Sequence, residues 1–309
     1  MDDGGTCRPV QLDDISTIIT GEGICMPGAT FSLDGQLVAA ASCYDAGQVL
    51  IARSADNHTF SAPEPIDAVA SDSTGATVDG RSYLYFVSWP GGLTRAEVTL
   101  TGLGPSESLT LVGASTVPYW PQAVGTEWGV LLGFVESQTS ASLATSEDGV
   151  SFAVEPAPIG TDNLRGVLLH VGQTAGGRSV LAHQNADASW SFTSRVQLGG
   201  DGASWSEPIV VDDGNVHDTF PVARLDAGAD LYFLKAGPTQ ELNVFRRSLG
   251  EDGALGPVQS VTAPVVGHVE KPQARRLADG RLALMFAMRK ATYQYGIGLA
   301  ILDHDAPTD

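Results

Sequence analysis

Alternating runs of apolar and polar residues, each followed by a turn and a strongly apolar run, recur along this chain. In residues 27–41, Asp34-Gly35 separates an alternating run from a run of Leu, Val and Ala. An Asp-Gly pair between two such runs is a strong signal for a tight β-hairpin. No stretch keeps the 3.6-residue period of an amphipathic helix. The pattern therefore predicts an all-β protein built from hairpins.

The hairpin pattern occurs six times at regular intervals. The units start near residues 27, 75, 121, 166, 221 and 272, which gives spacings of 48, 46, 45, 55 and 51 residues. A third strand follows each hairpin, and in most units a turn and a short outer strand come next. Repeats of about 40–50 residues with four strands each are typical of β-propeller blades. We therefore expect one six-bladed β-propeller domain over residues 1–309, with four-stranded antiparallel blades.

The last unit ends after its third strand, so another part of the chain must supply its outer strand. Residues 8–14 resemble residues 207–213, which contain the outer strand expected for an earlier unit. Pairing the N-terminal segment with the last blade closes the ring and removes the exposed sheet edges of an open array. We therefore expect residues 8–14 to complete the last blade.

A turn of the form Ser-x-Asp-Gly-x-Ser-aromatic precedes several of the expected outer strands. It is clearest in residues 146–152, good in 199–205 and 54–60, and weak in 250–256. The motif resembles the Asp-box, or BNR repeat, of sialidase-like propellers, and with the six hairpins this resemblance covers nearly the whole chain. It implies a structural role, in which the carboxylate accepts N–H bonds and the aromatic ring packs between sheets. The carboxylates concerned are Asp56, Asp148, Asp201 and Asp252.

Candidate chemistry gathers where the inner strands begin, because these positions line the mouth of a propeller's channel. Four are acids that can do acid–base work if burial shifts their pKa values: Asp72, Asp162, Asp218 and Glu270. Six more are candidate ligand-binding residues: Tyr119, Trp120, Arg165, His217, His268 and Lys271. The aromatic side chains can stack on a sugar, and the cationic ones can meet a carboxylate. The alternative is that all of them are solvated loop residues.

The resemblance to sialidases stops at the residues that bind sialic acid. In that family an arginine lies at the start of the first inner strand, where this chain has Ile24-Cys25-Met26-Pro27. Tyr293 and Tyr295 lie late in the chain, as the family's nucleophile does, but nothing in the sequence ties them to a catalytic Glu. A metal site formed by His217 and His268 with Asp218 is conceivable, but we expect no metal and no cofactor. The departure from the family pattern argues against typical sialidase activity.

Charge and composition restrict the partners. The chain has 36 acidic and 17 basic residues and a net charge of −19, which disfavours nucleic acid and anionic membranes. No apolar run approaches the roughly 20 residues that a membrane-spanning helix needs, and the first residues lack the features of a signal peptide. Cys25 and Cys43 flank the Asp34-Gly35 turn symmetrically, so they are either disulfide partners or buried thiols. Cys7 has no evident partner.

These observations favour an exported propeller, extracellular or in the cell envelope, that binds a glycan or a protein at its channel mouth without catalysis. The alternative is a glycoside hydrolase or lyase that uses mouth carboxylates on a substrate other than a typical sialoside. A purely structural interaction module is the third interpretation. An enzyme requires two carboxylates facing each other across the channel, about 5–10 Å apart, whereas a lectin requires an aromatic platform. Nothing in the sequence predicts the oligomeric state.

Overall fold

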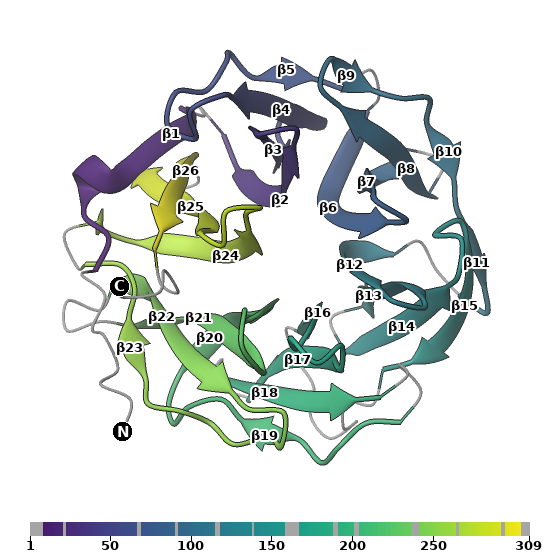
Figure 1. Cartoon of the computed structure of the whole chain (residues 1–309), viewed down its shortest axis with the longest axis vertical. Coiled ribbons are helices and arrows are strands. Elements are labelled where there is room, and N and C mark those ends of the chain that lie inside the picture. The colour runs from purple at the N-terminus through teal and green to yellow at the C-terminus, as the bar shows by residue number, and fades with distance from the viewer. Residues whose placement is uncertain are drawn as a thin grey trace.

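The computed structural model describes residues 9–20, 23–66, 69–89, 92–114, 118–137, 139–157, 167–187, 191–200, 204–236, 241–263, 266–291 and 294–303. In this part of the chain the strands form six small sheets, arranged as blades around a central axis (Figure 1). Helix is nearly absent from the described residues, and the short 3₁₀ turn η1 (Leu12–Asp14) precedes the first strand. The predicted six-bladed, all-β propeller is therefore confirmed.

Each of the first three blades begins with an inner strand at the axis and proceeds outward. The first blade contains β2 (Cys25–Leu33), β3 (Gln36–Cys43), β4 (Gln48–Ser54) and β5 (Glu64–Pro65). The second contains β6 (Ala70–Val78), β7 (Arg81–Ser88), β8 (Gly92–Thr99) and β10 (Glu107–Ser108), with β9 (Gly102–Leu103) also on β8. The third contains β12 (Tyr119–Thr126), β13 (Gly129–Ser137), β14 (Ser140–Ser146) and β15 (Ser151–Pro156), and β11 (Thr110–Val112) pairs in parallel with β15.

The remaining blades follow the same order. The fourth contains β16 (Leu168–Gln173), β17 (Ser179–Ala186), β18 (Phe192–Gly199) and β19 (Ile209–Val210). The fifth contains β20 (Val216–Ala223), β21 (Ala229–Ala236), β22 (Leu242–Leu249) and β23 (Gln259–Ser260). The sixth contains β24 (Val269–Arg276), β25 (Leu282–Ala291), β26 (Gln294–Leu302) and, from the N-terminus, β1 (Ile15–Ile19). The inner strands β2, β6, β12, β16, β20 and β24 surround the centre of the ring (Figure 1).

An N-terminal strand closes the ring, as expected, but the expected residues were wrong. The outer partner of β26 is β1, with Ile15 opposite Ala300 and Thr17 opposite Gly298. Within the expected segment 8–14, Val10 instead forms a parallel bridge with Thr262, beside the outer strand of the fifth blade, and η1 follows. The segment therefore runs along the outside of the ring before the closing strand begins.

The apolar core is divided among the six interfaces between neighbouring blades. Each buried cluster draws its side chains from two adjacent blades, for example Phe31 and Val38 from the first with Leu84 and Phe86 from the second. The closing strand contributes Ile18 and Ile19, which are 5% and 6% exposed, to the cluster between the sixth and first blades. Packing between blades thus holds the inner strands in fixed positions around the channel.

Local sequence explains the turns and the narrow centre. The β2–β3 turn has positive φ at both Asp34 (45°) and Gly35 (82°), as a type I′ hairpin turn requires. Near the axis the inner strands approach closely, so that a Cβ on Gly125 would lie 1.8 Å from the carbonyl oxygen of Thr77 in the preceding blade. Glycine at this position is what allows the two strands to pack side by side.

A disulfide joins Cys25 and Cys43, which face each other in the β2–β3 register. This is one of the two alternatives that the sequence left open, and Cys7 lies outside the described residues. The bond fixes the start of the first inner strand to the end of its neighbour, directly before Tyr44. Among the described residues, no helix has the length and hydropathy needed to cross a bilayer.

Candidate functional site

The inner strands share an irregularity close to their starts. The register shifts by one or more residues near the beginning of β2, β6, β12, β20 and β24. At four of these bulges a non-glycine residue has a positive φ: Asp72 (46°), Trp120 (48°), Asp218 (46°) and Lys271 (51°). The other non-glycine residues with positive φ in the described part of the chain lie in turns that follow strands: Asp34 and Asp79 after the far ends of β2 and β6, and Asn57 after β4.

These bulges are energetically costly, which makes their shared position informative. A left-handed conformation costs a residue with a side chain about 1–2 kcal/mol, and Trp and Lys lack the short polar side chain that eases it for Asp. Bulges re-aim side chains and are common beside active sites, where strained backbone also concentrates. Four costly conformations at equivalent levels of the ring therefore mark the channel mouth as the candidate site.

Neighbouring blades support the bulges through hydrogen bonds. The backbone N–H of Asp218 donates to Oε1 of Gln184 in the fourth blade, at 2.7 Å. The N–H of Ser73, next to Asp72, donates to Oγ of Ser42 in the first blade, at 2.9 Å. Each bond satisfies a backbone N–H group that has no strand partner at the bulge. The conformation of the mouth is thus fixed by contacts between blades.

Asp72 lies in surroundings that oppose its charge. Asp72 is 8% exposed, and burial raises the pKa of its carboxyl group. The hydrogen bond from Tyr44 and the charge of Lys271 act in the opposite direction and lower this pKa. The Tyr44 hydroxyl donates to Oδ1 of Asp72, and burial together with this carboxylate raises the pKa of the phenol. The backbone N–H of Trp120 also donates to Asp72. Asp72 is therefore a carboxyl group that exchanges protons at higher pH than an ordinary aspartate.

Lys271 contacts both Asp218, the second carboxylate at the mouth, and the ring of Trp120. Its Nζ lies 3.4 Å from Oδ1 of Asp218 and 5.1 Å from the centre of the Trp120 ring, a cation–π arrangement. The same ammonium group acts electrostatically on Asp72. Asp72 and Asp218 thus both interact with one cation, while Trp120 remains 40% exposed.

A small cavity of about 30 Å³ lies beneath these residues. His170 of β16 lines it and is 3% exposed, and neither ring nitrogen has a hydrogen-bond partner in the described part of the chain. Burial lowers the pKa of this imidazole to about 4, so it is neutral at physiological pH. Its ring packs edge-on against Phe220, with centroids 5.4 Å apart. An unpartnered buried imidazole is costly, and here it faces a space large enough for a hydroxyl group or a water molecule.

Glu270 belongs to a separate group on the sixth blade. Its Oε1 accepts a hydrogen bond from the Tyr295 hydroxyl at 2.8 Å and lies 3.0 Å from Nε2 of His268. The other His268 nitrogen lies 3.0 Å from Oε2 of Glu241. Burial and Glu270 both raise the pKa of Tyr295, whose residue is 6% exposed. The structure therefore pairs a late tyrosine with a glutamate, although the raised pKa is opposite to what a phenolate nucleophile needs.

The remaining candidates take different positions. Tyr119 is 42% exposed beside Trp120, and His217 packs on the Phe192 ring with centroids 4.4 Å apart. Burial lowers the pKa of His217. Asp162 and Arg165 lie outside the described residues. Among the side chains that the structure describes, no group of three or more His, Cys, Asp and Glu is arranged to hold a metal ion.

The repeated Asp turns lie at the other end of the blades, after the third strands. Oδ1 of Asp148 accepts N–H bonds from Val150 and Ser151 at 2.8 and 2.9 Å, and Oδ1 of Asp56 does the same for two residues of its own turn. Asp252 accepts a single N–H bond of this kind, from Ala254. These bonds have the geometry that a structural role requires. Asp201 lies outside the described residues.

Sequence reasoning missed two residues of the mouth, Tyr44 and His170. Tyr44 follows a second strand rather than starting an inner one, and only the fold brings it to Asp72. His170 lies in the sequence Val167-Leu-Leu-His170-Val, and a histidine inside such an apolar run was the available signal. His170 is buried and Tyr44 is half-buried, so both differ from the exposed loop residues expected at a channel mouth.

Similarity to known proteins is visible at the level of structure. A protein of unknown function from Dyadobacter fermentans aligns over 96% of this chain and 99% of its own, with a TM-score of 0.69 and 14% identity. A variant of the NanB sialidase from Streptococcus pneumoniae aligns over 94% of this chain and 70% of its own, with a TM-score of 0.70 and 9% identity. The catalytic domain of the GH62 α-L-arabinofuranosidase from Coprinopsis cinerea covers 96% and 94%, with a TM-score of 0.53 and 9% identity.

No protein-family model matches the sequence, and no curated protein matches it. At identities of 9–14% the structural matches establish a shared fold and leave the chemistry to be argued from the site. They place the chain beside sialidases and other propeller glycosidases in architecture.

Proposed function

We propose that the channel mouth binds a carbohydrate, with Trp120 as the stacking platform. The observation that carries the proposal is the set of strained bulges at Asp72, Trp120, Asp218 and Lys271, which place an exposed indole beside two carboxylates and an ammonium group. Sugar recognition combines an aromatic face for the C–H groups with charged and polar groups for the hydroxyls. All of these elements lie within one small region of the mouth.

The charges favour a neutral sugar. Lys271 is balanced by Asp218 and Asp72, and Glu270 and Glu241 add negative charge nearby. A sialoside carboxylate would therefore meet more negative than positive charge among the described mouth residues. The cavity of about 30 Å³ beside His170 is too small for a sugar ring but admits a hydroxyl substituent. We infer that the ring lies on Trp120 while one hydroxyl reaches into this cavity.

Measuring glycan binding by the wild-type protein and by Trp120→Ala tests the proposal. A glycan array identifies ligands, and calorimetry with the best neutral glycan should show at least about tenfold weaker binding for the variant, as for other aromatic binding hot spots. Trp89→Ala is the matched control, because Trp89 is also an exposed tryptophan, at 52%, but lies after β7. Equal losses in both variants, or an array without any bound neutral glycan, would contradict the proposal.

Glycoside hydrolysis is the second candidate, and the raised pKa of Asp72 favours it. A carboxyl group with a raised pKa is suited to donate a proton to the leaving oxygen of a glycosidic bond, while a second carboxylate acts on the other side of the sugar. Asp218, which lies 3.4 Å from Nζ of Lys271, is the second carboxylate. In this assignment the leaving alcohol takes the proton from Asp72, water supplies the hydroxyl group of the new reducing end, and Asp218 accepts the proton that the water loses.

The hydrolase candidate predicts a leaving-group dependence. Nitrophenyl glycosides leave without protonation, whereas glycosides of ordinary alcohols require it. Asp72→Asn should therefore abolish cleavage of neutral oligosaccharides while keeping a larger share of the activity on nitrophenyl glycosides. An absence of turnover of either substrate class by the wild-type protein would leave carbohydrate binding alone as the function.

We further propose that the chain is exported and that its Asp turns are Asp-boxes. The Cys25–Cys43 disulfide supports export, because such bonds persist in oxidising compartments. The hydrogen bonds of Asp56 and Asp148 support the second point. Fractionation of the source cells tests export, and recovery of the chain with the cytoplasm would overturn it.

A further inference from the structure

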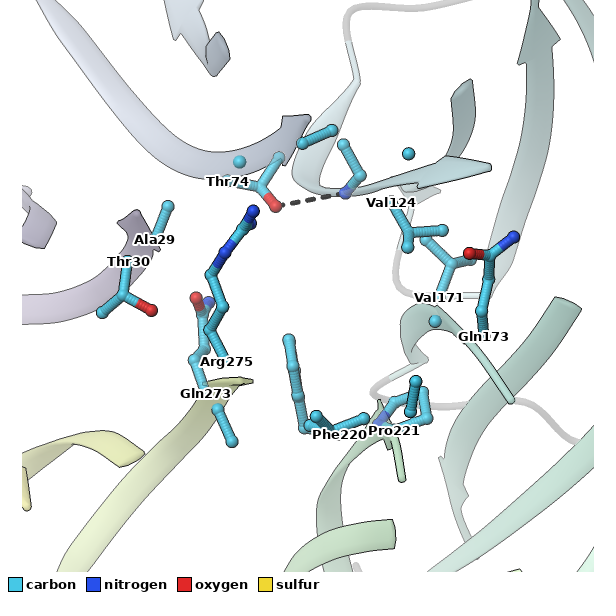
Figure 2. Close-up of a pocket in the computed structure, with 18 of the residues that line it drawn as sticks. Ala29, Thr30, Thr74, Val124, Val171, Gln173, Phe220, Pro221, Gln273 and Arg275 are labelled. Carbon is cyan, nitrogen blue, oxygen red and sulfur yellow. Dashed lines mark hydrogen bonds between the residues drawn. The ribbon is translucent and has the colours of Figure 1, made fainter. Parts of the chain in front are cut away.

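A second cavity lies in the channel below the mouth and has a different character. Its volume is about 310 Å³, and residues of all six inner strands line it (Figure 2). Much of the wall is apolar, with Ala29, Val124, Val171 and Phe220 among the lining residues. The lining extends to Ala223 and Arg276, the last residues of β20 and β24. The cavity therefore reaches toward the face of the ring opposite the mouth.

One arginine crosses this cavity. Figure 2 shows the Arg275 side chain extending from β24 toward the strand that carries Thr74. Its Nη2 donates to Oγ1 of Thr77 at 2.6 Å, and its guanidinium carbon lies 5.6 Å from the centre of the Phe31 ring. Among the described residues this is its one hydrogen bond, so its other N–H groups have no protein acceptor.

The charge of Arg275 is not balanced by the protein. None of the described residues that line the cavity is Asp or Glu, and burial alone lowers the pKa of Arg275, with no carboxylate acting on it. The two other arginines of the lining are engaged elsewhere. Arg224 makes two bonds to Asp226, at 2.8 and 2.7 Å, and Arg276 donates to backbone carbonyls. In a chain with a net charge of −19, Arg275 is thus a cation in a deep site without a carboxylate partner among the described residues.

We infer that this cavity binds a small organic carboxylate, with Arg275 as its charge partner. A guanidinium group presents parallel N–H donors that match a carboxylate, and such pairs are stronger than neutral hydrogen bonds. The apolar part of the wall suits a short hydrocarbon tail, which an inorganic phosphate lacks. The ligand enters from the face opposite the mouth, so this site is separate from the carbohydrate site proposed above.

Calorimetry with butyrate as the probe tests the inference. The wild-type protein should bind one butyrate, and Arg275→Met should lose at least about tenfold in affinity, since hydrogen bonds between charged groups are worth that much. Arg281→Met is the matched control and should bind butyrate like the wild type. Arg281 follows the same strand, but it pairs with Asp279 outside the cavity. Equal butyrate affinity in the wild type and Arg275→Met would overturn the inference.

A second measurement needs no variant and therefore does not depend on the folding of Arg275→Met. In saturating butyrate, the methyl protons of the ligand should give nuclear Overhauser contacts to the Phe220 ring of the wild-type protein. Their absence would overturn the placement in the channel. A parallel titration with inorganic phosphate separates the classes of anion, and phosphate binding without butyrate binding would overturn the assignment to carboxylates.

Discussion

At the scale of single residues, Asp72 shows how the fold sets the chemistry of a side chain. The sequence identifies it as an acid at the start of an inner strand, with no feature that distinguishes it from the other acids there. Its raised pKa arises because the fold buries it, and the hydrogen bond from Tyr44 and the charge of Lys271 compensate only in part. The residue is thus held in a state that favours function over stability.

Replacing the carboxyl group by an amide should therefore stabilise the protein at neutral pH. The folded state raises the pKa of Asp72. The contribution of Asp72 to the free energy of unfolding is therefore fully present below the ordinary pKa of about 4 and is lost as the pH rises. The asparagine of Asp72→Asn does not ionise, so this pH-dependent loss of stability disappears. Its side-chain amide oxygen still accepts the hydrogen bond from Tyr44. Urea unfolding at pH 7 should show a gain on the order of 1 kcal/mol. At pH 4 the gain should shrink, and a gain that grows toward acid would contradict the electrostatic explanation.

At the scale of elements, the inner strands combine parts that local sequence predicts with parts that it does not. The Asp34-Gly35 turn is predicted because two residues determine its conformation. The bulges at Trp120 and Lys271 are not, because neither residue type favours positive φ and the neighbouring blades impose it. The sequence therefore places most of the mouth residues at the right strand ends, but it indicates neither the strain nor the side chains that meet across blades.

Glycine should reveal the strain at Lys271. At a positive φ, Gly is more stable than Ala by about 1 kcal/mol, because it has no Cβ to clash with the backbone. Lys271→Gly should therefore unfold at higher urea concentration than Lys271→Ala, although both lose the contacts with Asp218 and Trp120. Ala274, in the regular part of the same strand, is the control, and Ala274→Gly should be less stable than the wild type. The same order of Gly and Ala at both positions would show that the bulge is unstrained.

At the scale of the whole molecule, closure of the ring follows from the count of strands, but its residues do not. The last of the six hairpin units lacks its outer strand, so a strand from the N-terminus must complete it. The sequence predicts this closure. The similarity of residues 8–14 to residues 207–213 is local, and many segments satisfy so short a pattern. The structure instead places Ile18 and Ile19 in the cluster between the last and first blades, and this burial decides which segment pairs with β26.

Truncation from the N-terminus should separate the two segments. A chain that begins at Ile15 keeps β1 and loses Val10, whereas a chain that begins at Thr20 also loses Ile18 and Ile19. Burial of each isoleucine is worth about 1.5–3 kcal/mol, so the shorter chain should be less stable by at least about 3 kcal/mol in urea unfolding. Its β26 would also present an unpaired edge that can add strands from other molecules. Size-exclusion chromatography should therefore show self-association of the shorter chain alone. Equal stability and equal elution of the two chains would mean that residues 15–19 do not hold the ring closed.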